Sequence, residues 1–221
     1  MLLERIKAHS ASLGDRPALT AGEEVVRWGE LWPMAQGLAA KLRAEGVGPV
    51  ALIGDPAEVW APVAFVACLL AGRPYLPLDP QLPPAGQREL LEQAGAVLLD
   101  RRTAEEGFAS GLSCPLPDDP GRIAYQIFTS GSTGKPKLVE VSLGNLEHFL
   151  RWASALPEIA PVLGGTAVGQ AAWSFDLSVA DLYLSLLGGG THVALTRGEK
   201  GDFAALFRRL AASDVSLLVA T

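Results

Sequence analysis

Apolar residues recur at a spacing of three or four along several long stretches of the chain, a pattern that predicts amphipathic helices. Leu31, Leu38 and Leu42 fall on one such face, and Gly46 ends the pattern. Residues 59–72 carry no charge, and this length suits a buried helix rather than a membrane span. The predicted helices cover residues 2–13, 29–44, 57–70, 87–93, 143–155, 177–187 and 202–212.

Short apolar runs lie between these helices and predict strands. Residues 17–27 read as a hairpin that turns at Ala21 and Gly22. The other predicted strands cover residues 50–53, 75–78, 96–99, 123–128, 138–141, 166–169, 192–195 and 215–219. This alternation predicts an α/β fold with mostly parallel sheets covered by helices.

The segment 113–121, SCPLPDDPG, is the best candidate for a linker, because proline, aspartate and glycine interrupt the pattern there. We therefore expect two α/β lobes, one formed by residues 1–118 and one by residues 119–221.

Composition narrows the classes of function. The chain of 221 residues is 49% hydrophobic and 19% charged, which is typical of a globular protein with a sizeable core. The net charge of −6 argues against nucleic acid as a partner. Cys68 and Cys114 lack metal-site or C-x-x-C spacing, and the charged N-terminus does not resemble a signal peptide. We expect a cytoplasmic protein with free thiols and no membrane partner.

The most informative segment follows the apolar run IAYQIF that begins at Ile123. A strand there feeds a small loop rich in hydroxyl groups and glycine, in which backbone N–H groups, hydroxyls and lysines can hold a polyphosphate. The loop is not a P-loop, since Thr129 stands where the first glycine belongs and Pro136 follows Lys135. By turn chemistry alone, a loop of serine, threonine and glycine is more often a solvated turn than an anion site. The candidate residues for binding ATP or pyrophosphate are Thr129, Ser130, Gly131, Ser132, Thr133, Gly134, Lys135 and Lys137.

The string TSGSTGKPK closely resembles the T-S-G-[ST]-T-G-x-P-K-G signature of the adenylate-forming enzymes. Every position from Thr129 to Lys137 fits, and Leu138 replaces the final glycine. The segment LLAGRPYLPLDP, residues 69–80, also resembles the family, and we interpret it as structural. The chain as a whole is most similar to the N-terminal half of nonribosomal peptide synthetase adenylation domains and of D-alanine–carrier-protein ligases.

A second motif, Phe175-Asp176-Leu177-Ser178, matches the F-D-x-S segment of amino-acid-activating adenylation domains. Asp176 either begins the following helix as an N-cap or binds the α-ammonium of an amino acid, the role that the resemblance implies. By the same resemblance Leu177 and Ala180 would line the side-chain pocket, and core packing is an equally good interpretation of them. We expect Asp181 to be solvated or to cap the helix.

The resemblance implies a reaction in which an amino-acid carboxylate attacks the α-phosphate of ATP and releases pyrophosphate. Mg²⁺ would bridge phosphate oxygens, largely through water, and no protein ligand for it is expected in this chain. The acyl group would then pass to the phosphopantetheine thiol of a carrier protein.

Several family motifs are absent from the 221 residues: the N-x-Y-G-P-T-E segment, the Y-x-T-G-D aspartate, the hinge and the C-terminal lysine. We therefore assign no catalytic residue and expect the chain alone to be inactive. A second polypeptide that supplies the other half is one explanation; a fragment and a degenerate module are others. An acyl-CoA or aryl-acid synthetase and a non-catalytic nucleotide- or partner-binding module stay open as alternative functions.

Overall fold

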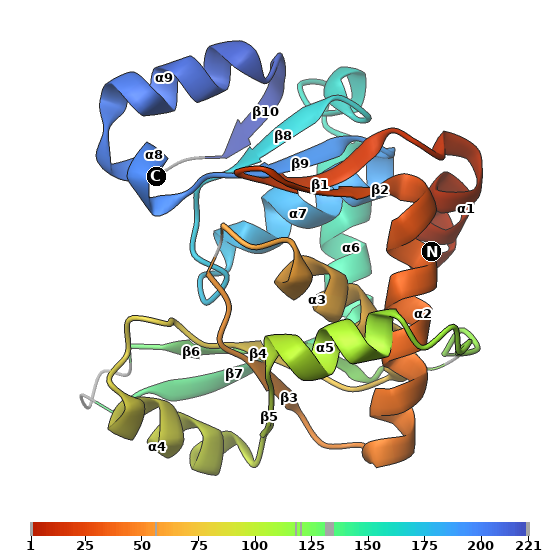
Figure 1. Cartoon of the computed structure of the whole chain (residues 1–221), viewed down its shortest axis with the longest axis vertical. Helices are drawn as coiled ribbons and strands as arrows, with labels where there is room; N and C mark the ends of the chain where they lie inside the picture. The colour runs from red at the N-terminus through yellow and green to blue at the C-terminus, as the bar shows by residue number, and fades with distance from the viewer. Residues whose placement is uncertain (1, 56, 118, 120, 131–134, 220–221) are drawn as a thin grey trace.

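Two five-stranded sheets form the framework of the chain in the computed structural model, which describes residues 2–55, 57–117, 119, 121–130 and 135–219 (Figure 1). Sheet A has the strand order β10-β8-β9-β1-β2, and sheet B has the order β5-β3-β4-β6-β7. Helices lie between the sheets and on their outer faces (Figure 1). The α/β class that the sequence predicted is confirmed.

Sheet A is parallel except at one edge. Its strands are β1 (Pro17–Ala21), β2 (Glu24–Arg27), β8 (Thr166–Gly169), β9 (Thr191–Ala194) and β10 (Val215–Val219). The strands β10, β8, β9 and β1 run parallel, and β2 returns antiparallel to β1 through the predicted hairpin.

Sheet B has the same plan. Its strands are β3 (Val50–Leu52), β4 (Tyr75–Pro77), β5 (Val97–Leu99), β6 (Ile123–Thr129) and β7 (Lys137–Ser142). The first four are parallel, and β7 lies antiparallel to β6. The described strands were all expected, β1 and β2 as the predicted hairpin and the others from their apolar runs.

The helices also match the prediction, with two additions. They are α1 (Leu2–Leu13), α2 (Trp28–Glu45), α3 (Trp60–Ala71), α4 (Pro84–Ala94), α5 (Arg101–Phe108), α6 (Leu143–Ser154), α7 (Leu177–Gly188), α8 (Arg197–Gly201) and α9 (Phe203–Ala212), with a 3₁₀ turn at Ala160–Val162. The sequence did not predict α5 or α8. No helix within the described ranges has the length and apolar character needed to cross a bilayer.

The main core lies between the two sheets around α3, a helix in which every residue is buried. Phe65 of α3 stacks on Tyr75 of β4, with ring centroids 4.4 Å apart. Trp173, which precedes α7, meets the same phenylalanine edge-on. A continuous apolar helix needs cover on all sides, and its place between two sheets provides it.

Two glycines allow α5 to approach α2 closely. A Cβ atom on Gly37 would lie 2.4 Å from the carbonyl oxygen of Gly107, and one on Gly107 would meet Leu38. Any larger side chain at either position would force the helices apart.

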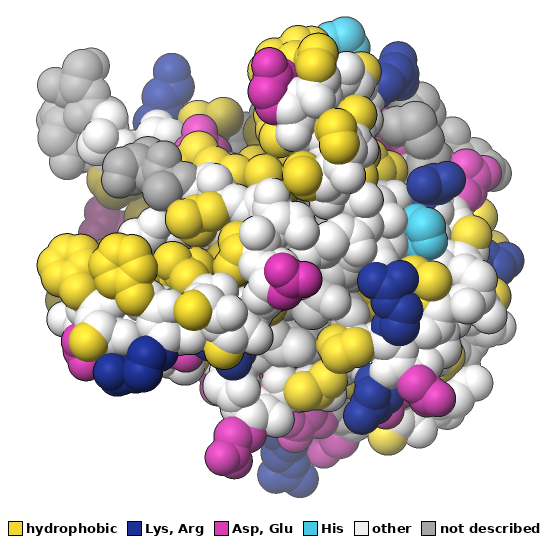
Figure 2. Space-filling view, turned by 90° about the horizontal axis from the view of Figure 1, so that it is seen from above, with side chains coloured by type: hydrophobic (Ala, Val, Ile, Leu, Met, Phe, Trp, Pro, Cys, Tyr) yellow, Lys and Arg dark blue, Asp and Glu magenta, His cyan; other side chains and the backbone are white. Residues whose placement is uncertain are grey.

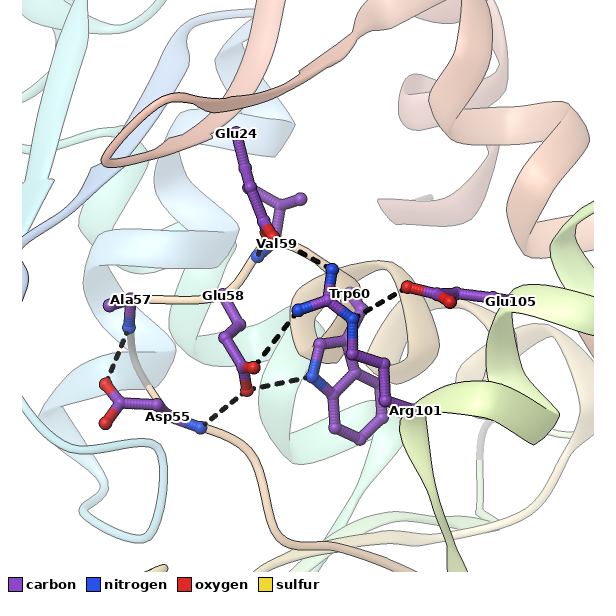
Figure 3. Close-up of polar contacts among 8 residues, drawn as sticks. All are labelled: Glu24, Asp55, Ala57, Glu58, Val59, Trp60, Arg101 and Glu105. Atoms are coloured by element: carbon purple, nitrogen blue, oxygen red, sulfur yellow. Dashed lines mark hydrogen bonds and ion pairs between the residues drawn. The ribbon is translucent and has the colours of Figure 1, made fainter.

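A network around Arg101 links the two sheets at their surface (Figure 3). Its guanidinium contacts Glu24 of β2 at 2.8 Å, Glu58 ahead of α3 at 3.1 Å, and Glu105 one turn along α5 at 2.7 Å. Glu58 in turn accepts hydrogen bonds from the Trp60 indole and from a backbone amide. The pKa of Arg101 is raised, mainly by its hydrogen bonds to Glu105 and Glu24.

The expected division at residues 118–119 does not separate the sheets. Sheet A takes β1 and β2 from the first segment, and sheet B takes β6 and β7 from the second. Residue 118 itself lies outside the described residues, and the described part of 109–122 contains neither helix nor strand. The two structural layers are therefore built from interleaved parts of the chain.

Candidate functional site

The two ends of the hydroxyl-rich loop are held together by the β6–β7 pair. Thr129 lies opposite Lys137 in the register, and its hydroxyl donates to the Lys137 carbonyl at 3.4 Å. Lys135 and Lys137 are both exposed to solvent. Gly131, Ser132, Thr133 and Gly134 lie outside the described residues. The described ends thus present a hydroxyl and two ammonium groups at one end of sheet B.

A cavity of about 240 Å³ opens beside this loop. Its wall includes Thr129, Ser130 and Pro136 from the loop, and Ser174 from the segment before α7. The remaining lining residues are Pro77, Leu78, Asp79, Leu82, Leu90 and Phe128. An apolar floor with a few polar groups at its rim is the usual character of a site for a small ligand.

Leu138, which replaces the glycine of the signature, lies on β7, one residue after Lys137. It pairs with Phe128 across the ladder and packs, partly buried, on the small cluster formed by Ala51, Leu76, Leu78 and Leu90. The strand continues through Leu138 without interruption.

Asp176 lies directly before α7 with its carboxylate exposed. It occupies the N-cap position but makes no side-chain capping hydrogen bond, so the capping interpretation is not supported. Its charge adds to burial, the larger cause, in raising the pKa of Tyr125 to about 12. Since Tyr125 lies on β6, the strand that leads into the loop, Asp176 faces the same region of the molecule.

Leu177 and Ala180 follow in the first turn of α7 and are half-buried. Ala180 packs against the main core. The structure brings both close to Asp176 in the helix without distinguishing a pocket role from a packing role.

A second cavity of about 240 Å³ adjoins the first and shares Leu78, Asp79 and Ser174 with it. Arg197 and Lys200 of α8 also line it. Arg197 forms an ion pair of 3.0 Å with Asp55, and burial is the main cause that lowers the pKa of Lys200. These basic residues were missed, because the five-residue helix α8 has no apolar period that would reveal it.

The expectation that Asp181 is solvated or caps the helix is wrong. It is fully buried rather than solvated, and its carboxylate accepts no hydrogen bond from a described residue. Burial raises its pKa to about 7, and the nearby backbone amides of Val219 and Gln170 only partly offset this effect. Residues 178–187 of α7 are almost all buried, and the apolar period of this helix was the sequence signal that Asp181 lies inside.

His192 of β9 is another buried ionisable group, and like Asp181 it lies within electrostatic reach of Lys200. Burial lowers its pKa to about 4, and Lys200 adds to the effect. Its imidazole lies 5.6 Å from the ring of Trp173, and Gly169 leaves room for it, since a Cβ there would approach Nε2 to 2.5 Å. The imidazole is therefore neutral near pH 7 and packed in the interior.

The described groups fit a phosphate ligand better than a metal ion. Hydroxyls of Thr129 and Ser130 and the ammonium groups of Lys135 and Lys137 are donors that suit phosphate oxygens. Within the described ranges no three His, Cys, Asp or Glu side chains gather as metal ligands.

Sequence comparison identifies the family. The sequence profile of the AMP-binding enzymes matches residues 6–110 and 100–221, nearly the whole chain. The chain belongs to the AMP-binding enzyme family. Among curated relatives, the D-alanine–D-alanyl carrier protein ligase of Bacillus licheniformis is 35% identical over 100% of this chain and 47% of its own length. Tyrocidine synthase 3 of Brevibacillus parabrevis is 32% identical over 91% of this chain and 3% of its own length.

Solved structures of the family share the fold. The nonribosomal peptide synthetase FmoA3 superposes with a TM-score of 0.77 at 26% identity, over 88% of this chain and 22% of that one. The Vibrio cholerae adenylation domain AlmE, solved with glycyl-adenosine-5′-phosphate, gives a TM-score of 0.73 at 21% identity, a likeness that shows the fold alone. The chain spans about half the length of the two carrier-protein ligases that it matches, 47% and 48%.

Proposed function

We propose that this chain forms the phosphate-binding and amino-group-binding part of an ATP-dependent amino-acid adenylating ligase. One observation carries the proposal: Ser174, two residues before Asp176, lines the same cavity as Thr129 and Ser130 of the loop. The segment that leads to Asp176 and the described end of the loop therefore contribute to the wall of one cavity.

In the proposed reaction an oxygen of the amino-acid carboxylate attacks the α-phosphorus of ATP, and the bond to the bridging oxygen breaks to release pyrophosphate. Thr129, Ser130, Gly131, Ser132, Thr133, Gly134, Lys135 and Lys137 would hold the departing phosphates. The contribution of these groups is charge stabilisation and positioning, which can supply much of the rate of a phosphate-displacement reaction.

Asp176 would bind the substrate ammonium. Its carboxylate is exposed and takes no part in capping α7, so its oxygens can accept a charge-assisted hydrogen bond. Leu177 and Ala180 would line the side-chain pocket, and the small Ala180 leaves room for a larger substrate side chain.

Mg²⁺, when bound, would offset the charge of the phosphate oxygens, with water completing its coordination. In the second half-reaction the phosphopantetheine thiol of a carrier protein would attack the acyl carbonyl and release AMP. Since ATP and carrier proteins are cytoplasmic, we propose that location for the reaction, and a second polypeptide as one source of the remaining ligase length.

The test is ATP–pyrophosphate exchange with a panel of amino acids, using this chain together with the remaining ligase length. Asp176→Asn should lower kcat/KM roughly 10- to 100-fold, the range expected for a hydrogen bond to a charged group. Lys137→Ala should lower the exchange rate with every amino acid. Lys7→Ala, which changes an exposed lysine of α1, is the matched control and should leave exchange intact.

Other outcomes select the alternatives. Exchange with acyl or aryl acids that survives Asp176→Ala would identify an acid synthetase. Absence of exchange with any carboxylic acid would leave a non-catalytic binding module.

A further inference from the structure

The 170–176 segment, which connects β8 to α7, carries several groups of the candidate site. Gln170, Trp173 and Ser174 line the second cavity, and Ser174 lines the first as well. Asp176, the candidate partner of the substrate ammonium, is the last residue of the segment. All residues of the segment are described, and none belongs to a helix or a strand. A binding group on such a stretch has to be held in place by its surroundings.

Trp173 anchors the middle of the segment. Its buried ring lies between Phe65 of α3 and His192 of β9, with ring centroids 5.6 Å apart in each pair. Ring packing fixes the position of one side chain, but the direction of the backbone on either side depends on hydrogen bonds.

Ser178, in the first turn of α7, supplies one set of these contacts. Its buried hydroxyl donates to the carbonyl oxygen of Phe175 at 2.7 Å and lies 3.3 Å from that of Trp173. Ser185, buried further along the same helix, instead donates to the carbonyl of Leu182 within α7 at 2.8 Å. Two serines of one helix therefore differ in whether they reach the segment.

Asp181 faces the other end of the segment. Helix α7 lies beneath sheet A and packs against β8, β9 and β10 (Figure 1). The backbone amides near the Asp181 carboxylate are those of Gln170, the first residue of the segment, and Val219, the last residue of β10. Neither carboxylate oxygen forms a hydrogen bond of ordinary geometry with a described residue, yet both amides favour the charged form. This arrangement fits a group that tightens onto its donors when it is ionised.

The carboxyl of Asp181 is costly to bury in this place. In the view from above (Figure 2) acidic side chains are spread over the surface, where water solvates them, whereas Asp181 has no exposed surface. Burial raises its pKa to about 7, so its ionisation lowers the stability of the fold. A group that costs stability near neutral pH and faces a binding segment is a candidate for a functional role.

We propose that Ser178 and Asp181 are positioning residues for the amino-acid substrate, which hold the 170–176 segment against α7 so that the Asp176 carboxylate is oriented toward the substrate ammonium. This inference rests on the proposed function. An ionised carboxylate attracts backbone N–H groups more strongly than the neutral acid does, so the segment is held when Asp181 is charged. Protonation of Asp181 releases the start of the segment.

The groups around Asp181 identify it as the source of such a pH dependence. Strands β8 and β10 contain no ionisable side chain. Strand β9 contributes His192, whose pKa of about 4 leaves it neutral above pH 6, and α8 contributes Lys200, whose charge favours the ionised carboxylate. Ionisable side chains of α1 and α6, the other helices packed on α7, have partners of their own: Arg5 and His9 at the Leu187 carbonyl, and Glu147 at the Leu2 amide.

The experiment measures ATP–pyrophosphate exchange between pH 6 and pH 8, using this chain together with the remaining ligase length and the amino acid that exchanges fastest. Ser178→Ala is compared with Ser185→Ala, which removes a buried hydroxyl bonded within the same helix. Asp181→Asn is compared with Asp15→Asn, which changes an exposed carboxylate between α1 and β1. The KM of the amino acid and the KM of ATP are determined separately.

Ser178→Ala should raise the KM of the amino acid about 5-fold, the effect of one lost hydrogen bond, and leave the KM of ATP unchanged. Ser185→Ala should change neither. In the unsubstituted chain the KM of the amino acid should rise roughly 10-fold from pH 8 to pH 6, because the ionised fraction of a group with a pKa of about 7 falls by that factor. Asp181→Asn should have the high KM at both pH values, and Asp15→Asn should follow the unsubstituted chain.

Stability separates positioning from a structural role. Asp181→Asn removes a buried charge, so at pH 8 it should be more stable to urea while it binds the amino acid less well. A carboxylate with only a structural role would change stability and KM in the same direction.

Amide NMR spectra of residues 1–221 test the contact without catalysis. The resonances of the Gln170 and Val219 amides should shift with a midpoint near pH 7, and that of Ser174 should follow them. Asp181→Asn should abolish all three shifts.

Three results overturn the proposal: amide resonances of Gln170 and Val219 that do not titrate near pH 7, a pH dependence of the amino-acid KM that survives Asp181→Asn, or equal effects of Ser178→Ala and Ser185→Ala. Amides that titrate as expected, in a protein that shows no exchange with any amino acid, would support the contact and count against the proposed function alone.

Discussion

At the scale of single residues, Asp181 is the most consequential group outside the candidate site. Burial removes the hydration that stabilises the charge of its carboxylate, so its pKa rises from 3.8 to about 7, and the backbone amides of Val219 and Gln170 offset only part of this shift. The folded chain therefore holds this proton more tightly than the unfolded chain does. The stability that results is complete below about pH 4 and is lost as the pH rises towards 7.

Asp181→Asn should remove this loss, since the amide fills the same space and carries no charge. We expect the free energy of unfolding at pH 8 to increase by roughly 1–3 kcal/mol, with little change at pH 4. Urea unfolding of both proteins between pH 4 and pH 8 measures the difference. His192, whose pKa is lowered to about 4, destabilises both proteins as the pH falls below 6.5, and so cancels in the comparison. If the difference in free energy of unfolding between the two proteins were the same at pH 4 and pH 8, the raised pKa of Asp181 would be contradicted.

At the scale of elements, β7 shows how the chain departs from its family signature without losing the strand. Leu138 packs on the same cluster as Phe128, and glycine at this position would lose that packing. The substitution therefore strengthens the strand that follows the loop.

Leu138→Gly, which restores the signature, should lower the free energy of unfolding by about 2 kcal/mol through lost packing and the greater freedom of glycine in a strand. Leu112→Gly, at an exposed position outside any element, is the comparison, and its effect should be smaller. Chemical denaturation of both variants is sufficient. Equal losses would show that Leu138 has no packing role.

The cap of α6 is a second prediction for an element. The Ser142 hydroxyl accepts a hydrogen bond of 3.1 Å from the Asn145 backbone amide. Ser142→Ala should cost about 1 kcal/mol of stability. Ser12→Ala, which removes only an exposed hydroxyl bonded within α1, should cost less, and thermal unfolding of the two variants separates them. A loss at Ser12 as large as that at Ser142 would contradict the capping role.

Local patterns predicted local structure well, because a strand or a helix is specified by its own period. The strands β6 and β10 and the helices α6 and α7 were found from apolar spacing. Helix α5 was missed because only Ala104 and Gly107 of its residues are buried, which leaves no apolar stripe to recognise. Its one local signal is Asp100, whose side chain accepts a hydrogen bond from the Thr103 amide.

The candidate site also contains residues that sequence motifs located and residues that no local pattern indicates. Motifs pointed to Thr129 and Ser130, which line one cavity, and to Asp176, which follows Ser174 of the same wall by two residues; their binding roles stay predictions. The involvement of Arg197 and Lys200 depends on how α8 lies against the end of sheet B, and no local pattern encodes that contact. The expectation for Asp181 was wrong because polarity was given more weight than the helix period around it.

At the scale of the whole molecule, Arg101 joins the two sheets through one guanidinium. A single exposed ion pair contributes little to stability. A guanidinium that contacts three carboxylates also offsets the repulsion among those carboxylates. Arg101→Met, which keeps the aliphatic stem, should cost roughly 1–2 kcal/mol at low salt and less at high salt. Arg102→Met removes one i,i+4 pair with Glu106 and is the control. Urea unfolding at two salt concentrations measures both, and equal losses would argue against a network effect.

The pairing of β1 with β9 has a consequence for how the chain reaches its fold. Leu19 lies beside His192 in one ladder, and Tyr75 lies beside Tyr125 in the other sheet. Each sheet therefore pairs strands that are separated by a long segment of the chain. Closure of such loops is entropically costly and slows folding. During synthesis the β1–β2 hairpin leaves the ribosome long before β9 does, so one edge of β1 stays unpaired until β9 has been made. A cut within residues 113–121 would leave two pieces that each contribute strands to both sheets.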